Sequence, residues 1–364
     1  MSLNSTRGAN REWSADSKEG PGRPAVSGRG RFSLSQYLEG ILAGDRSILA
    51  KAITLIESSH RADCELADEI LETCLKQKND SIVVGVSGVP GAGKSSLIEA
   101  LGHHIITNRE EKIAVLAIDP SSRISGGSIL GDKTRMAFLA SSDMAFIRPS
   151  PSRGTLGGVA AHTREAIVLC KAAGYRNVLI ETVGVGQSET AVREMVDFLL
   201  LVTIAGAGDE LQGMKRGVME MADAVTVNKA DGKNLREAEK ARALAESALQ
   251  FFSSSEPGWA PPAVVCSART GRGVKEIWSL ILEHHRIITQ SGYLERIRRE
   301  QNLCWFRENI ERGLKQMFLS SPNVRQRSTE LEKEVAAGEA APIAAARLLL
   351  SLYDPKWLHR ERED

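Results

Sequence analysis

The chain alternates short, almost continuous apolar runs with stretches that carry apolar residues at helical spacing. The apolar runs are rich in β-branched residues and occupy residues 82–86, 113–118, 144–148, 178–181, 198–204, 224–228 and 263–266. Strands that are apolar on both faces and separated by helices are typical of a parallel sheet covered by helices on both sides. The pattern therefore predicts an α/β fold with a mostly parallel sheet.

The two ends of the chain follow other patterns. Residues 1–32 are rich in Gly, Ser, Arg and Pro without apolar periodicity, which predicts disorder. Helical spacing from Leu34 to Lys76 predicts two or three helices before the first strand. From Gly292 onward the pattern is helical and charged, and residues 321–341 resemble a linker before a last apolar helix at 343–353.

Composition narrows the class of protein. Lys and Arg total 47 against 46 Asp and Glu, a net charge of +1, which argues against a chain built to coat nucleic acid or an anionic membrane. The five cysteines form no C-x-x-C pair and suit free thiols in a reducing compartment. The longest apolar stretch is too short to span a bilayer, and no secretory signal is visible. We expect a cytoplasmic protein with neither a nucleic-acid nor a membrane partner.

The segment GVPGAGKSS follows the first predicted strand and precedes a helical pattern, the setting that a P-loop requires. Its glycines allow backbone N–H groups to turn toward phosphates. The lysine would reach the β- and γ-phosphates, and the serine after it would bind Mg²⁺. The residues predicted to contact the nucleotide here are Gly88, Gly91, Ala92, Gly93, Lys94, Ser95 and Ser96.

A second motif, NKAD at 228–231, ends another apolar strand and predicts which base is bound. The Asp231 carboxylate can accept two hydrogen bonds from guanine N1 and its exocyclic amine, a donor pair that adenine lacks. The stem of Lys229 can lie over the base, and Asn228 can tie this loop to the P-loop. The CSAR segment after the next strand would place the Ala268 N–H at guanine O6, between Ser267 and Arg269. The predicted nucleotide is GTP rather than ATP.

Three acids between these motifs are candidate magnesium ligands. Asp119 and Glu181 each end a predicted strand, where a carboxylate beside a P-loop can bind Mg²⁺ directly or through a water. Asp132 lies in GGSILGDKTRM, where capping of a following helix is an equally open interpretation.

The strand ending at Glu181 continues as ETVGVGQ, so Val185 stands where many nucleotide switches carry a water-orienting glutamine. Gln187 could take that role only if the loop refolds. We therefore expect slow intrinsic hydrolysis that a partner accelerates. The glycine-punctuated stretch 206–223, which carries Lys215, is the predicted moving element, and the loop 152–160 is a second candidate.

Together, the motifs GVPGAGKSS, IDPSS, GGSILGDKTRM, ETVGVGQSE, GDELQGMKRG, NKAD and RREQNLCWF resemble the MeaB/MMAA (ArgK) family of G-protein chaperones of adenosylcobalamin-dependent methylmalonyl-CoA mutase. The resemblance spans about residues 35 to 320 and implies a P-loop GTPase with helical extensions at both ends and a homodimer. The boundaries we expect are a head at 1–32, a helical arm at 33–78, the GTPase domain at 79–290 and a C-terminal dimerisation extension and tail at 291–364.

The resemblance also implies a role and its residues. The protein would gate adenosylcobalamin loading onto the mutase and protect or reactivate that enzyme, with GTP/GDP and Mg²⁺ as cofactors. Nucleotide and Mg²⁺ contacts would fall to Lys94, Ser95, Asp119, Asp132 and Glu181, and Lys215 would take part in hydrolysis stimulated by the mutase.

Other functions remain open from the sequence. The client could be a related acyl-CoA mutase. A nickel-type metallochaperone GTPase would need a metal-capturing cluster, and the His103–His104 and His284–His285 pairs are adjacent rather than spaced for chelation. A kinase acting on a transport protein would need a phospho-acceptor site, which no motif resembles.

Overall fold

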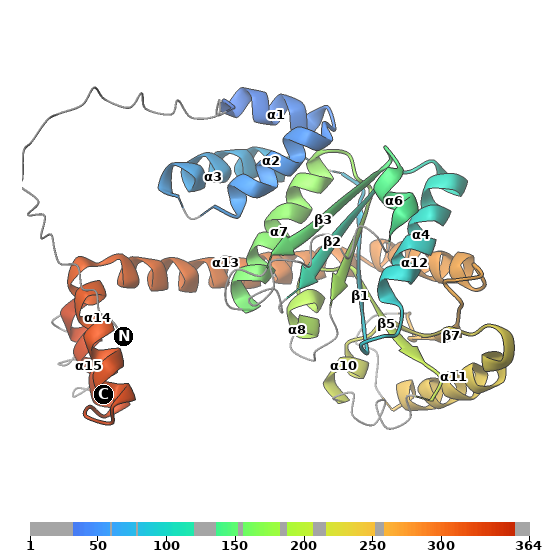
Figure 1. Ribbon diagram of the computed structural model, residues 1–364. Helices are drawn as coiled ribbons and strands as arrows, with labels where there is room; N and C mark the ends of the chain where they lie inside the picture. Colours follow the sequence, from blue (N-terminus) through green and yellow to red (C-terminus); the bar gives the residue numbers. More distant parts are fainter. Residues whose placement is uncertain are drawn as a thin grey trace, which may run out of the picture.

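The computed structural model describes residues 32–58, 60–77, 79–119, 136–151, 156–182, 188–206, 216–251 and 258–353. Its centre is a seven-stranded sheet in the order β3-β2-β4-β1-β5-β6-β7, with every neighbouring pair parallel (Figure 1). The strands are β1 (Ile82–Gly88), β2 (Ile113–Asp119), β3 (Ala145–Pro151), β4 (Asn177–Thr182), β5 (Phe198–Ile204), β6 (Ala224–Asn228) and β7 (Ala263–Val265). The predicted α/β fold and its seven strands are confirmed.

Alternate residues of the central strands enter two separate apolar cores, as the period of two in a β-strand requires. On one face Val83, Val178 and Leu199 join the core beneath the N-terminal helices and α7 (Leu156–Ala172). On the other face Val84, Leu179 and Leu200 pack with α4 (Lys94–Arg109) and α12 (Val274–Gln290). Burial on both faces explains why the strands read as continuous apolar runs.

The short α6 (Ala137–Ser141) packs against α4 and β3. Four further elements follow β4 along the chain. They are α8 (Ser188–Arg193), α10 (Arg216–Glu220), η1 (Gly232–Asn234) and the longer α11 (Leu235–Leu249). Helix α11 packs against β6 and β7, the last two strands in the order of the sheet (Figure 1).

Three helices precede β1 in the described residues: α1 (Leu34–Leu42), α2 (Arg46–Ile56) and α3 (Arg61–Leu75). Ser33 and Gln36 form a capping box at the start of α1, and Asp45 caps α2. Helices α2 and α3 pack against α7, and Arg148 of β3 forms an ion pair with Glu57 at 2.5 Å. These helices therefore share one apolar core with the sheet.

After α12 the chain forms α13 (Tyr293–Ser320), α14 (Pro322–Ala336) and α15 (Pro342–Tyr353). Helix α13 begins against the sheet domain and then projects away from it, and α14 and α15 form a hairpin at its far end (Figure 1). The linker predicted at 321–341 is wrong, because Pro322 begins a helix whose Val324 and Leu331 are buried. Their spacing of seven places both on one face of α14.

The predicted last helix at 343–353 is confirmed as α15. The predicted disordered head lies outside the described residues, apart from Phe32. In the described part of the chain, no helix is both long enough and apolar enough to cross a bilayer.

Candidate nucleotide site

The loop between β1 and α4 has a backbone shape that only glycine accommodates at two points. Gly88 has φ +142°, and a side chain there would collide with the backbone carbonyl of Val202 on β5. Gly93 has φ +85° and immediately precedes α4, where an added Cβ would lie 2.8 Å from Asn228 Nδ2. The loop therefore lies close to β5 and β6. It leads directly into the N-terminus of α4, whose free backbone N–H groups are suited to bind phosphate.

Lys94, the first residue of α4, is buried within this loop. Its ammonium donates hydrogen bonds to the carbonyls of Gly88, at 2.8 Å, and Val89, at 3.1 Å. The cation is thus held by the loop backbone that would surround the β- and γ-phosphates. Gly91 and Ser96 are exposed beside it, whereas Ala92 is buried.

Ser95 and Glu181 bring a hydroxyl and a carboxylate together at the edge of the sheet. The Ser95 hydroxyl donates to Glu181 Oε1 at 2.5 Å. This contact follows from the parallel pairing of β1 and β4, which places Val86 opposite Glu181. Oxygen donors of these two kinds are the ligands that Mg²⁺ prefers, so the residues fit this ion.

The other two predicted magnesium ligands are described only in part or not at all. Asp119 ends β2 at the same edge of the sheet, where Ile118 pairs with Thr182 of β4. Its side chain lies outside the described residues, as does the whole of Asp132.

Asn228 connects the P-loop to the predicted base-reading loops. Its amide Nδ2 donates to Ala92 O at 2.8 Å, and its Oδ1 accepts from Ala268 N–H at 3.1 Å. The link to the P-loop is the one that the sequence predicts for this residue. Lys229 has φ +60°, and its Cε lies 3.9 Å from the position of a Cβ on Gly93, so its stem lies beside the P-loop.

Asp231 is held in place by the loop that follows β7. The Ser267 hydroxyl donates to Asp231 Oδ2 at 2.7 Å, and the exposed Arg269 guanidinium lies 3.7 Å from Oδ1. The carboxylate is fixed at one oxygen and keeps capacity to accept further bonds. The Ala268 N–H, expected at guanine O6, donates here to Asn228, so that contact would require a shared hydrogen bond.

Two supporting contacts were not predicted from the sequence. Buried Thr182 donates to Ser87 Oγ at 2.9 Å and joins the ends of β4 and β1 below Glu181. The Cys266 thiol lies 3.4 Å from Asn228 Oδ1, and burial raises its pKa to about 11, which keeps it a neutral donor. The two hydroxyls of the first contact come directly after the predicted runs 82–86 and 178–181, and only the pairing of β1 with β4 brings them together.

The remaining predictions fall outside the described residues. Val185 and Gln187 lie in the undescribed segment 183–187, and Lys215 lies in 207–215. In the loop 152–160, residues 152–155 are undescribed, and nothing is described of the side chains that follow.

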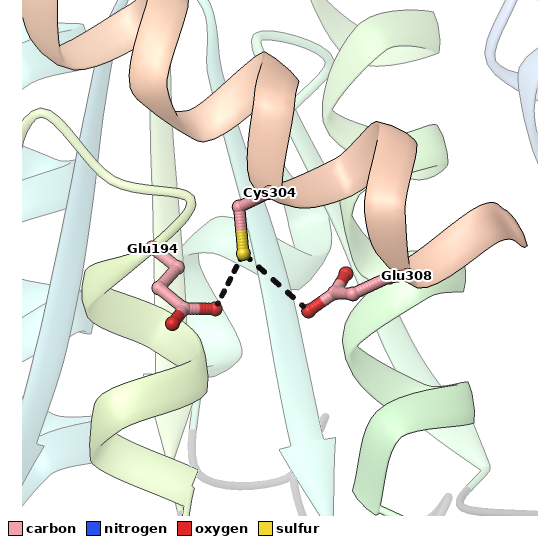
Figure 2. Close-up of side chains that lie close together, drawn as sticks. All are labelled: Glu194, Cys304 and Glu308. Carbon is pink, nitrogen blue, oxygen red and sulfur yellow. Dashed lines mark hydrogen bonds between the residues drawn. The ribbon is translucent and has the colours of Figure 1, made fainter. Parts of the chain in front are cut away.

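One group of side chains among the described residues has the composition of a metal site, which the metallochaperone alternative needs. Glu194, Cys304 and Glu308 place three potential ligand atoms within 4.8 Å of one another (Figure 2). However, the buried Arg164 guanidinium lies 3.3 Å from Glu194 and 3.4 Å from Glu308. Burial also raises the pKa of the Cys304 thiol. The two carboxylates already share one cation, whose charge repels a second cation at the same place.

The chain matches the family described as "Methylmalonyl Co-A mutase-associated GTPase MeaB" over residues 49–323. It is 47% identical over 312 residues to a probable GTPase of Mycobacterium tuberculosis, which covers 86% of this chain and 93% of the relative. It is 43% identical over 324 residues to the mouse "Methylmalonic aciduria type A homolog, mitochondrial", covering 86% and 78%. A crystal structure of "LAO/AO transport system kinase" superimposes with a TM-score of 0.67 at 35% identity, covering 88% of this chain and 97% of that one.

Proposed function

This chain belongs to the MeaB family of P-loop GTPases, and from that premise we propose that it is a chaperone of methylmalonyl-CoA mutase. The chain hydrolyses GTP to GDP and phosphate. Its hydrolysis would gate the loading of adenosylcobalamin onto the mutase and support the protection or reactivation of that enzyme. The observation that carries the proposal is the family match across residues 49–323, which includes the P-loop, the base-reading loops and the whole of α13.

The described contacts support specific roles in binding the nucleotide. Backbone N–H groups of Gly88, Gly91, Ala92 and Gly93 would surround the phosphates, with Lys94 neutralising their charge and Ser96 at the first turn of α4. Asp231 would accept from guanine N1 and its amine, and Lys229 would lie over the base. The loop that recognises the base would be held against the P-loop by Asn228, Ser267, Ala268 and Arg269.

Ser95 and Glu181, together with Asp119 and Asp132, would hold Mg²⁺ beside the phosphates. When bound, the ion neutralises charge that develops on the β- and γ-phosphate oxygens. The pairing of β1 with β4 brings the Ser95 hydroxyl and the Glu181 carboxylate within hydrogen-bond distance, so both oxygens are already close enough to bind one ion.

Hydrolysis would be slow until a partner completes the site. Val185 has no group that can orient water, and Lys215 in the loop 206–223 would supply the missing charge when the mutase rearranges that loop. A GTPase without its own water-orienting residue would keep GTP bound until the client protein stimulates hydrolysis.

Homodimerisation would use the exposed apolar face of α13. Five residues at successive spacings of three, four, four and three are exposed, namely Leu303, Phe306, Ile310, Leu314 and Met317. This spacing places all five on one face of the helix, where they form an apolar seam. A second copy of the chain would bury it, so we assign dimerisation to the extension at 291–364.

The remaining organisation follows the expected boundaries. The arm at 33–78 would act as part of the GTPase unit at 79–290, because both share one apolar core. The cytoplasm is the location we favour, because all five cysteines are free thiols. A related acyl-CoA mutase is the alternative client. The nickel-type alternative finds little support in the Glu194 cluster, where Arg164 occupies the cation position.

Complex formation tests the proposal. Purified chain would be mixed with methylmalonyl-CoA mutase in the presence of GDP or a non-hydrolysable GTP analogue, and the complex would be measured by calorimetry. The proposal expects saturable binding whose affinity differs between the two nucleotides. The absence of binding with either nucleotide, while a related acyl-CoA mutase binds, would transfer the role to that other client.

A further inference from the structure

A cleft separate from the nucleotide site lies between α7, the segment joining α8 to β5, and α13. Its volume is about 150 Å³. One ordered water needs roughly 10–15 Å³ measured in this way, so the cleft has room for a ligand of several heavy atoms. Helix α13 packs against α7 beside it.

The charged groups around the cleft are paired, with one exception. Arg298 forms a two-point ion pair with buried Asp197, at 3.0 and 2.9 Å, and Arg164 lies between Glu194 and Glu308. Lys171, at the end of α7, also lines the cleft. Among the described residues, its ammonium has no hydrogen-bond or ion-pair partner.

The position of this ammonium indicates a complementary anion. Burial lowers the pKa of Lys171, with the nearby Arg298 charge adding to this and Asp197 opposing it. Lys171 is half-buried, and a cation with reduced access to water gains from a ligand that accepts its hydrogen bonds. The carboxylate of Asp197 is already held by Arg298 and by the Val83 N–H, at 2.9 Å, so it does not serve as that partner.

The rest of the lining favours one class of anion over another. Ile167, Val168, Met195 and Trp305 contribute apolar walls. Among the described residues that line the cleft, Lys171 is the one cation without a partner, and it matches a single negative charge. A phosphate dianion would bring a second negative charge. Arg164 and Arg298 could not balance it, because both are already paired with carboxylates.

We propose that this cleft is a binding site for a small organic carboxylate, with the Lys171 ammonium as its charge partner and the apolar walls holding a short carbon chain. The carboxylate would accept hydrogen bonds from the lysine, and its chain would contact Val168 and Met195. The ligand would then bridge α7, which packs on the sheet, and α13, which leads into the C-terminal extension.

Methyl NMR of the full chain labelled at methionine provides a local readout, because Met195 lines the cleft. The Met195 signal would be assigned with Met195→Leu, and the probes would be acetate, propionate, butyrate and succinate, with inorganic phosphate for comparison. The expected result is a saturable shift of the Met195 signal with at least one carboxylate and none with phosphate at equal ionic strength.

Two variants separate loss of the site from loss of the fold. Lys171→Met removes the charge and keeps the stem, and Val168→Phe fills the cleft and keeps the ammonium. Each is expected to weaken carboxylate binding by at least about tenfold. The matched control Lys275→Met, at an exposed lysine of α12, should bind as the parent chain does. The methionine signals outside the cleft report whether each variant is folded.

The proposal is overturned if no carboxylate gives a saturable shift, or if phosphate gives the same one. It is also overturned if folded Lys171→Met and Val168→Phe both bind as tightly as the Lys275→Met control.

Discussion

The side-chain amide of Asn228 donates to the carbonyl of Ala92 at 2.8 Å, across 136 positions of sequence. The same side chain accepts from the Ala268 N–H, so one residue joins the phosphate loop to both loops that would read the base. Its neighbour Gly93 has no space for a side chain because this amide lies against it. The three loops are therefore fixed relative to one another by a single buried group.

Asn228→Ala should weaken GTP binding and stability together. It removes bonds to Ala92 and Ala268 and leaves a buried carbonyl unsatisfied, a loss of about 1–3 kcal/mol. Affinity for GTP, measured by calorimetry, should fall about tenfold or more. Asn108→Ala, at the exposed end of α4, is the control. Equal affinity of the two variants would show that Asn228 does not organise the site.

Asp231→Asn should change the base that is selected. The amide keeps an acceptor for N1–H but presents a donor where the carboxylate accepted from the guanine amine. Xanthine has a carbonyl at that position, so it should pair with the variant. We expect kcat/KM for GTP to fall about a hundredfold or more, and the value for XTP to rise. A variant that still prefers GTP would contradict the assignment of Asp231.

Phe306→Asp should dissociate the proposed dimer. The change places a charge within the exposed apolar seam of α13, at its one aromatic residue. Light scattering after gel filtration should give a monomer at concentrations where the parent chain is a dimer. Lys315→Asp is the matched control, because Lys315 is exposed on α13 outside the seam. If the parent chain is a monomer, or if Phe306→Asp remains a dimer, the seam of α13 is not a dimer interface.

The ion pair of Asp197 and Arg298 should make stability depend on pH in the acid range. Burial alone would raise the pKa of Asp197, but the two Arg298 bonds, the nearby Lys171 charge and the Val83 N–H outweigh it and hold the pKa below its usual 3.8. A carboxyl whose pKa is lower in the folded chain stabilises the fold above the unfolded value. That contribution is lost as the pH falls below about 4 through the folded value.

Asp197→Asn should therefore reduce the free energy of unfolding near neutral pH by about 2–4 kcal/mol. The difference from the parent chain should shrink as the pH falls below about 4, measured by urea unfolding at a series of pH values. Asp143→Asn, which removes an exposed partner of Arg46, should change stability little at any pH. A difference for Asp197→Asn that is constant across the acid range would mean that its charge is not responsible.

Much of the fold could be predicted because the central strands are buried on both faces. The run 198–204 has no polar alternation, and β5 occupies those residues. The segment 321–341 could not be identified as helical by composition, since its charges suggested a linker. Its helix depends on two apolar residues, Val324 and Leu331, that are buried only in the folded chain.

The site was predictable where a motif carries its own geometry. The positions of the glycines and of the strand ends determine the course of the loops at GVPGAGKSS and NKAD. The sequence could therefore predict that Lys94 lies in the P-loop and that Asn228 contacts it. The pair of Thr182 and Ser87 could not, because it depends on which strands become neighbours. Sheet order results from long-range packing, and no local pattern in β1 or β4 encodes it.

GTP turnover of the pure chain, alone and with excess methylmalonyl-CoA mutase, tests the central claim most directly, with ATP as the control nucleotide. The account predicts a slow basal rate, strong stimulation by the mutase, no ATP turnover, and loss of the stimulation in Lys215→Ala. A fast basal rate would contradict the role assigned to Val185. A slow rate that the mutase leaves unchanged would contradict the proposal that this enzyme is the client.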